Sequence, residues 1–284
     1  MEQYFIIYNP LAGNGDGKLA ADSIEVVLDS VVGMADITRI TNYRAFLADK
    51  TEYILIICGG DGTLNRFIND TEGLHISNRI FYYAIGTGND FLRDIDCSGY
   101  VTPVEITTYT KNLPVCEVNN KKYRFINGVG YGIDGYCNEE GNKLREKSDQ
   151  KVNYTKIAVK GLLRHYKPTG ADVTVDGMKQ RFEKVWLAPT MFGRYYGGGM
   201  MPTPEQNRRA AEQLTSLFVF HGSGKLKTLI IFPQIVSGKH IKYTKYVSLI
   251  KGKEIIVEFD NPRPMHIDGE TIGNVKKYAV HAGI

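Results

Sequence analysis

The sequence has few of the residues that mark a disulfide framework or a metal centre. Its four cysteines lie far apart in the chain, and no two of them have the Cys-x-x-Cys spacing. A zinc ribbon and a disulfide-rich secreted domain are therefore excluded, and the pattern is typical of a protein from a reducing cytoplasm. The six histidines do not cluster at metal-ligand spacing either.

The sequence also lacks long apolar runs. No segment approaches the roughly 18 apolar residues that a membrane-spanning helix needs. The first ten residues, MEQYFIIYNP, contain no basic segment followed by an apolar core. We therefore expect no signal peptide, no membrane span and a cytoplasmic location.

Acidic residues are missing from one long stretch, although the net charge of the chain is only +4. Residues 225–253 contain seven lysines and no acid, and residues 141–167 contain eight Lys or Arg against two acids. Such stretches, interleaved with apolar residues, can lie on anionic lipid, although many are simply solvated faces. We expect a peripheral contact with the inner face of a membrane. A nucleic-acid partner is not expected, because the pI of about 8.7 is modest and no binding module is present.

Strand-like and helix-like segments alternate over the first 100 residues. This alternation predicts a Rossmann-like domain with a parallel α/β sheet, in which ligands bind at the carboxyl ends of the strands. The predicted strands are 4–8, 35–41, 53–58 and 80–85, and the predicted helices are 18–32, 43–50 and 63–70.

From about residue 101 the sequence becomes rich in strands and predicts an antiparallel β-sandwich domain over residues 101–274. Asp176 and Gly177 separate two strand-like runs as a hairpin turn would. Helical patterns cover about 150–166 and 226–237. The predicted strands are 103–109, 114–118, 122–129, 171–176, 183–190, 215–220 and 254–259.

Three glycine-containing loops follow three of the N-terminal strands: NPLAGNGDGK (9–18), GGDGTLN (59–65) and GTGND (86–90). Glycines at such points allow backbone amides to approach a phosphate closely, and a helix N-terminus adds a positive dipole. The P-loop and Gly-x-Gly-x-x-Gly patterns do not fit these loops.

Asp61 lies between glycines in the second loop. A carboxylate beside a polyphosphate needs a cation between them, and Mg²⁺ bridges carboxylate and phosphate oxygens. Asp61 is therefore a candidate for organising Mg²⁺ that arrives with a nucleotide. The alternative is that Asp61 only caps a helix that begins near Thr63.

Five motifs in order give the chain a resemblance to the diacylglycerol kinase catalytic-domain family, which includes bacterial lipid kinases and the related sphingosine kinases. They are Asn-Pro-x-x-Gly (9–13), GGDGT followed by GTGNDF (59–63 and 86–91), FINGVGYGID (125–134), YYGGGMMPTP (195–204) and HIDGE (266–270). GGDGT alone is shared with phosphofructokinases and NAD kinases, so the order of all five carries the resemblance.

The resemblance implies a nucleotide-binding α/β domain at 1–100 and a lipid-substrate domain at 101–274, with the nucleotide in a cleft between the domains. The tail at about 275–284 would return to the first domain. The cofactors would be ATP and Mg²⁺, and the γ-phosphate would pass to a hydroxyl of diacylglycerol or a similar lipid. Together with the loops, it gives these candidate nucleotide-binding residues: Asn9, Pro10, Leu11, Ala12, Gly13, Thr41, Gly59, Gly60, Asp61, Gly62, Thr63, Leu64, Asn65, Arg66, Gly86, Thr87, Asn89 and Asp90.

The DGE motif implies that Glu270 accepts the proton of the lipid hydroxyl, with Asp268 beside it and Asp61 at the phosphates as the other catalytic residues. A carboxylate near the phosphates is the group that such a proton transfer needs. Asp268-Gly269 is equally a strong signal for a hairpin turn, and a turn can also carry a site.

Two departures from the family pattern are present. Arg66 stands where the family usually has Glu, and residues 204–217 lack the Asp-Gly-Lys-Leu segment that binds a structural Mg²⁺ in some relatives. We therefore expect no structural metal in that loop. An NAD kinase-like phosphotransferase and a catalytically silent nucleotide-binding regulator remain as alternatives, and an edge strand of either sheet could pair two copies into a homodimer.

Overall fold

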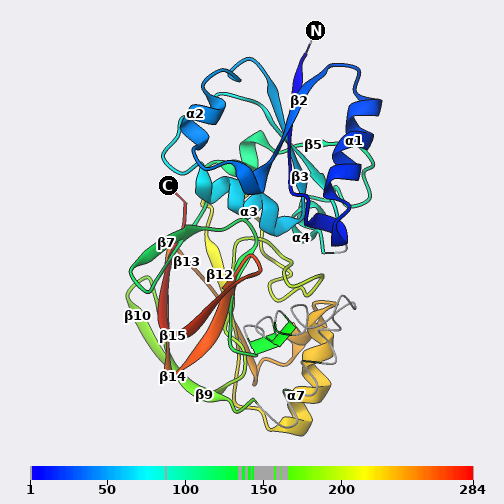
Figure 1. Ribbon diagram of the computed structural model, residues 1–284. Coiled ribbons are helices and arrows are strands. Elements are labelled where there is room, and N and C mark those ends of the chain that lie inside the picture. The colour runs from blue at the N-terminus through cyan, green and yellow to red at the C-terminus, as the bar shows by residue number, and fades with distance from the viewer. Residues whose placement is uncertain are drawn as a thin grey trace. The chain divides into compact units, whose positions relative to one another are not determined.

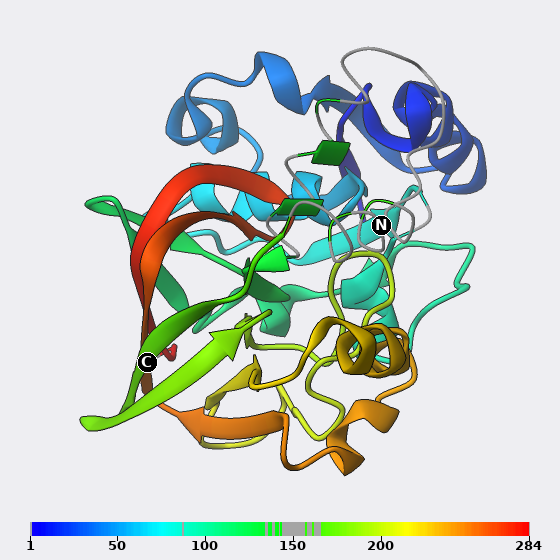
Figure 2. The same ribbon diagram turned by 90° about the horizontal axis from the view of Figure 1, so that it is seen from below.

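The computed structural model describes residues 2–86, 88–133, 136–137, 140–141, 143, 157, 161 and 166–283. The chain divides into two compact units, Met1–Leu113 and Pro114–Ile284. Each unit is described by itself (Figures 1 and 2). Most of the helix predicted at 150–166 lies outside the described residues.

Parallel strands form most of the sheet of the first unit. Its order is β2-β1-β3-β4-β5, with only the β4–β5 pair antiparallel. The central strand β3 is buried along its whole length, as expected for a parallel strand covered on both faces. The strands are β1 (Tyr4–Tyr8), β2 (Val31–Asp36), β3 (Ile54–Gly59), β4 (Ile80–Ala84) and β5 (Val104–Glu105).

Helices cover both faces of this sheet, and Figure 1 shows α1 and α2 on opposite sides of it. Ile24 of α1 packs in one cluster with Ile6 and Ile56. On the other face, Phe5 makes an edge-on contact with Phe46 of α2. The helical segments are η1 (Ala12–Asn14), α1 (Gly17–Val27), η2 (Ile37–Arg39), α2 (Tyr43–Leu47), α3 (Asp61–Asp70), α4 (Asp90–Asp94) and η3 (Thr107–Thr110).

Three predicted segments that fall in the first unit have different boundaries in the structure. The helix predicted to 32 ends at Val27, and β2 begins at Val31 instead of 35. β2 ends early because the Asp36 side chain accepts the backbone amide of Thr38, which starts a turn of 3-10 helix. The strand predicted at 103–109 is only β5, because the Thr107 hydroxyl accepts the amide of Ile80 where η3 begins. Since β5 pairs with β4, the division of the chain lies at Leu113 rather than near residue 100.

The second unit is built on a ten-stranded antiparallel sheet. The strand order is β13-β12-β11-β8-β14-β15-β6-β7, and β9 connects β10 to β14. The strands are β6 (Val115–Val118), β7 (Lys121–Arg124), β8 (Gly128–Tyr131), β9 (Thr169–Val175), β10 (Met178–Val185), β11 (Thr190–Met191), β12 (Thr215–Phe220), β13 (Val247–Gly252), β14 (Glu254–Ile267) and β15 (Glu270–His281). The helical segments whose bounds lie wholly in the described part of this unit are α7 (Lys225–Ile231), η5 (Phe232–Ile235) and η6 (Lys239–Lys242).

Strand β14 gives this unit its sandwich character. Its first half pairs with β9 and its second half with β8, while β15 pairs along its other edge. The Asp176–Gly177 hairpin turn is confirmed, with both residues at positive φ. The segment predicted as one strand at 122–129 is two strands. The tail from 275 is part of β15 and pairs with β6 in the second unit, because Tyr278 and Val280 are buried there.

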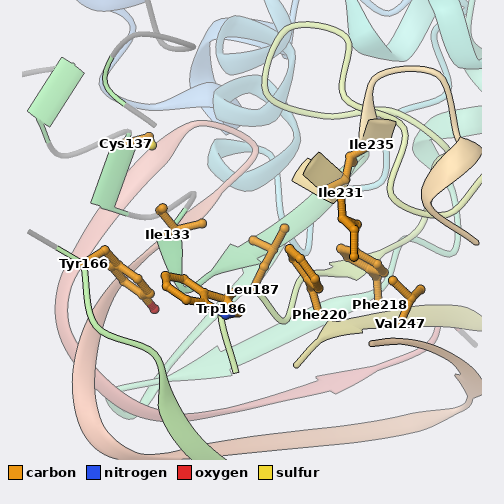
Figure 3. Close-up of a cluster of buried hydrophobic side chains, with 10 residues drawn as sticks. All are labelled: Ile133, Cys137, Tyr166, Trp186, Leu187, Phe218, Phe220, Ile231, Ile235 and Val247. Atoms are coloured by element: carbon orange, nitrogen blue, oxygen red, sulfur yellow. The ribbon is translucent and has the colours of Figure 1, made fainter. Parts of the chain in front are cut away.

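The core of the second unit contains the only tryptophan of the chain. In Figure 3, Trp186 lies beside Tyr166 and Leu187, and Ile231 and Ile235 point toward Phe218 and Phe220. Two turns of helix are thus held on the sheet by their inward apolar side chains. In the described part of the chain, no helix combines the length and the apolar character that crossing a bilayer requires.

Candidate active site

Hydrogen bonds connect the three glycine-containing loops of the first unit. β1, β3 and β4 are parallel, so their carboxyl ends meet at one edge of the sheet. The side-chain amide of Asn9, which follows β1, donates to the Thr63 hydroxyl, with 2.9 Å between Nδ2 and Oγ1. The amide of Ile85, after β4, donates to the carbonyl of Gly59 at 2.9 Å. The loops predicted to bind phosphate therefore form one connected rim.

Asp61 connects the second and third loops. Its Oδ2 accepts the backbone amide of Asp90 at 2.8 Å, and Asp90 is the first residue of α4. The Tyr82 hydroxyl lies 3.5 Å from Oδ1, and burial together with the Asp61 carboxylate raises the pKa of Tyr82 well above its usual value. Helix α3 begins at Asp61 with Gly60 as its N-cap, so the alternative that Asp61 is the cap of this helix is wrong.

The first loop owes its shape to two glycines. Gly13 is left-handed, with φ of 63°, and a Cβ at Gly17 would overlap with the carbonyl oxygen of Asn9. Because Gly17 is the first residue of α1, this contact brings the start of the helix against the end of β1. The Asn9 side chain also accepts the amide of Leu11 at 3.0 Å, which closes the turn.

The structure places the other predicted nucleotide-binding residues at different depths. Pro10, Ala12 and Gly62 are half-buried beside the rim, and Gly86 and Leu11 are exposed. Thr41 is exposed in the short segment between η2 and α2. Leu64 and Asn65 are buried in α3 and belong to its packed face. The Arg66 guanidinium faces Asp70, one turn further along α3, at 3.3 Å. Thr87 lies outside the described residues.

Oxygen atoms at this rim suit a hard cation. Asp61 and Asp90 supply carboxylates, and the Asn89 Oδ1 atom is buried with no hydrogen-bond partner in the described part of the chain. The described residues contain no group of three His, Cys, Asp or Glu side chains that could enclose an ion. The donor set therefore fits an ion that takes most of its ligands from nucleotide phosphates and water.

The Asp268–Gly269 turn of the second unit holds its two acidic residues in different surroundings. Both turn residues have positive φ, and Ile267 pairs with Glu270 across the hairpin. The buried Asp268 carboxylate accepts three successive backbone amides, from Ile126 at 2.6 Å and from Asn127 and Gly128 at 2.9 Å. Glu270 is exposed at the first position of β15. Asp268 thus anchors the turn, and Glu270 is the carboxylate that is accessible.

His266 is a neighbour of this turn that the sequence interpretation did not single out, although it is the first residue of the HIDGE motif. Its Nδ1 accepts the amide of Gly269 at 3.4 Å, and its ring stacks on Tyr196 with centroids 5.5 Å apart. Burial lowers the pKa of His266 to about 4. A neutral ring thus connects the turn to the YYGGGM segment, where Gly197, Gly198 and Gly199 all have positive φ.

Arg208 is a second residue that the sequence interpretation missed. It lies in the loop that departs from the family pattern, yet it is buried. Its Nη1 donates to the carbonyl of Ile126 at 2.9 Å, and its guanidinium lies over the ring of Phe192. The segment 126–128 therefore donates its amides to Asp268 and accepts a hydrogen bond from the buried Arg208 at the carbonyl of Ile126. The neighbouring polar residues Asn207 and Arg209 gave no signal of this burial.

Comparison with known proteins covers both units. The family described as "Diacylglycerol kinase catalytic domain" matches residues 3–115, which contain all three loops. The family described as "YegS C-terminal NAD kinase beta sandwich-like domain" matches residues 127–281, more than half of the chain. The chain belongs to the diacylglycerol kinase catalytic-domain family.

Members of the diacylglycerol kinase family are similar to this chain over most of its length. The Bacillus subtilis protein named "Putative lipid kinase YtlR" is 25% identical, with 96% of this chain and 94% of that protein covered. The protein of Mycobacterium tuberculosis H37Rv named "Diacylglycerol kinase" is 24% identical, with 88% and 83% covered.

Solved structures show the same fold as this diacylglycerol kinase family member. A Bacillus anthracis structure named as "a putative diacylglycerol kinase" has a TM-score of 0.68 at 19% identity, covering 99% of this chain and 92% of that one. Yeast NADH kinase has a TM-score of 0.51 at 8% identity, covering 100% and 79%. The predicted fold, an N-terminal parallel α/β sheet followed by an antiparallel β-sandwich, is confirmed.

Proposed function

We propose that the protein is an ATP-dependent lipid kinase, which transfers the γ-phosphate to a hydroxyl of diacylglycerol or a similar lipid. The observation that supports this most is the connected rim of three glycine-containing loops in a chain that matches both domains of this kinase family. Relatives named as lipid kinases support the same class of acceptor.

The rim would hold the phosphates of ATP. The first turn of α3 presents amides and the positive end of the helix dipole, which favour bound phosphate. Asp61 and Asp90 would hold Mg²⁺ through ATP, and that ion would neutralise charge on the phosphates. The residues around Asn9 and Gly13 would shape the loop that closes on the nucleotide.

Glu270 would accept the proton of the lipid hydroxyl. As the hydroxyl oxygen bonds to the γ-phosphorus, the bond from that phosphorus to the bridging oxygen breaks, ADP leaves, and the proton passes to the Glu270 carboxylate. Asp268 would not take the proton, because its oxygens accept amides of Ile126, Asn127 and Gly128. Its role would be to position the turn that carries Glu270.

An acceptor screen tests the proposal. The purified protein is incubated with Mg²⁺, γ-labelled ATP and, in separate reactions, detergent-dispersed diacylglycerol, sphingosine, ceramide, a polyprenol and NAD. We expect label in one lipid product and none in NAD. Label in NAD alone would support an NAD kinase instead, and no label in any acceptor while ATP still binds would support a nucleotide-binding regulator.

A further inference from the structure

Helix α7 of the second unit has an apolar face directed to solvent. Thr228 and Ile231 are fully buried on its inner side. Leu226 and Ile230, which are spaced i and i+4 and so share a face, are 81% and 55% exposed. Large apolar side chains clustered at a surface usually mark an interaction site.

The segment that follows α7 carries positive charge, and the ring of Tyr243 in this segment lies 5.3 Å from the Lys227 ammonium of α7. Lys239, Lys242 and Lys245 are exposed, and within the described part of the chain none of them forms a salt bridge. The Lys242 ammonium also lies 5.2 Å from the centroid of the Tyr243 ring, and that of Lys245 lies 5.8 Å from the ring of Tyr246. Lysines beside partly buried aromatic rings and exposed aliphatic side chains are the composition of a membrane-interface segment.

A second exposed apolar site serves as a comparison. Helix α1 carries Val26, which is 80% exposed, but its neighbours include Asp22, Glu25 and Asp29. An anionic surface would repel these acids. In contrast, residues 225–253 contain seven lysines and no acid. Charge therefore distinguishes the α7 face from the α1 face as a surface for anionic lipid.

We propose that residues 225–245 form a membrane-docking surface for an anionic bilayer, with Leu226 and Ile230 entering the interface and Lys239, Lys242 and Lys245 lying at the lipid phosphates. The value of such a surface to the protein rests on the proposed function, since a lipid kinase must reach acceptors that lie in a bilayer. The binding itself does not require catalysis.

Sedimentation with vesicles tests this surface. The full chain is mixed, without nucleotide, with large vesicles of phosphatidylcholine containing 30 mol% phosphatidylglycerol or of phosphatidylcholine alone. We expect binding to the anionic vesicles that weakens as salt is raised. The triple variant Lys239→Gln, Lys242→Gln, Lys245→Gln should bind about 100-fold more weakly, since each lysine near an anionic surface contributes on the order of fivefold. The double variant Leu226→Ser, Ile230→Ser should bind about tenfold more weakly.

Matched variants control for charge and apolar area in general. Lys111→Gln, Lys121→Gln, Lys277→Gln removes three exposed lysines elsewhere, and Val26→Ser removes an exposed apolar side chain from α1. Both should bind as the wild type does. Equal binding by all variants, absence of wild-type binding, or a loss confined to Val26→Ser would overturn the proposal. Failure of the proposed function would be seen separately, as no labelling by the wild type of a short-chain acceptor that needs no vesicle.

Discussion

Glu270 and Asp268 are two carboxylates separated by one glycine, and their surroundings assign them different tasks. The Asp268 oxygens receive three amides from a segment about 140 residues earlier in the chain, whereas Glu270 projects from the start of a strand. The Asp-Gly-Glu pattern in the sequence predicted the turn. The pattern could not show which of the two carboxylates accepts backbone hydrogen bonds, because the three donating amides lie in a segment that no local pattern connects to the turn.

Replacing Glu270 tests its proposed role. Glu270→Gln should lower kcat by about 100- to 10,000-fold, because the amide cannot accept the hydroxyl proton. The side chain is exposed, so the urea midpoint should not change. Glu212→Gln, at another exposed acid of the same unit, is the control and should retain kcat. Retention of full activity by Glu270→Gln would require a different base.

The hydrogen bond from the buried Arg208 guanidinium to the carbonyl of Ile126 should stabilise the second unit. Arg208→Met leaves the Ile126 carbonyl without its donor, and we expect the free energy of unfolding to fall by roughly 1–3 kcal/mol. Urea unfolding followed by the fluorescence of Trp186, the single buried tryptophan, measures this change. The exposed neighbour changed as Arg209→Met should stay within about 0.5 kcal/mol of the wild type. Equal effects at both positions would show that the buried contact contributes nothing.

At the scale of elements, the rim depends on side chains that connect one strand end to the next. The four parallel strands of the first unit, helices α1, α2 and α3, and the glycine-containing loops could be predicted, because each of these elements has its own periodicity or its own glycines. The contacts between these loops could not be predicted from the sequence. The bond from Asn9 to Thr63 joins residues 54 positions apart, and either residue alone looks like an ordinary turn or helix position.

Thr63 in the first turn of α3 and Thr71 at its C-cap allow the geometry of the rim to be tested separately from the stability of the helix. Thr63→Val removes the acceptor of the Asn9 amide, and Thr71→Val removes a buried hydroxyl that donates to the Phe67 carbonyl at the far end of the helix. Each should lower the free energy of unfolding by about 1 kcal/mol. Only Thr63→Val should also weaken ATP binding, by about tenfold in calorimetry, since the loop after β1 loses its tie to α3. Equal weakening by both variants would contradict a specific role for this contact.

At the scale of the whole molecule, the histidines with lowered pKa all lie in the second unit. They are His221, His240 and His266, and burial is the main cause in each case. A histidine that is kept neutral by folding gains its proton first in the unfolded chain. Stability from this source is therefore complete above about pH 6.5 and is lost as the pH falls toward the folded value of about 4 for His266.

The free energy of unfolding of the second unit should therefore fall in acid, because these histidines bind protons more readily in the unfolded chain. For His266 the loss between pH 6.5 and 4 is about 3 kcal/mol. Trp186 fluorescence reports this unit, so its urea midpoint should fall across that interval in the wild type. His266→Phe should show a shallower dependence on pH, while its stability at pH 7 reports the cost of losing the contact with Gly269. An unchanged pH dependence in His266→Phe would show that His266 does not couple folding to protons.

The position of β15 inside the second sheet has a consequence for biosynthesis. This strand lies between β14 and β6 in the sheet. The β6–β7 hairpin therefore cannot pair with the rest of the sheet until β15, which ends at residue 281, has left the ribosome. The first unit, residues 1–113, contains every strand of its own sheet and can assemble on the nascent chain much earlier. The β6–β7 hairpin must then wait, with its pairing edge open, for more than 140 further residues to be translated. The second unit is thus the part of the newborn protein that most needs protection by chaperones.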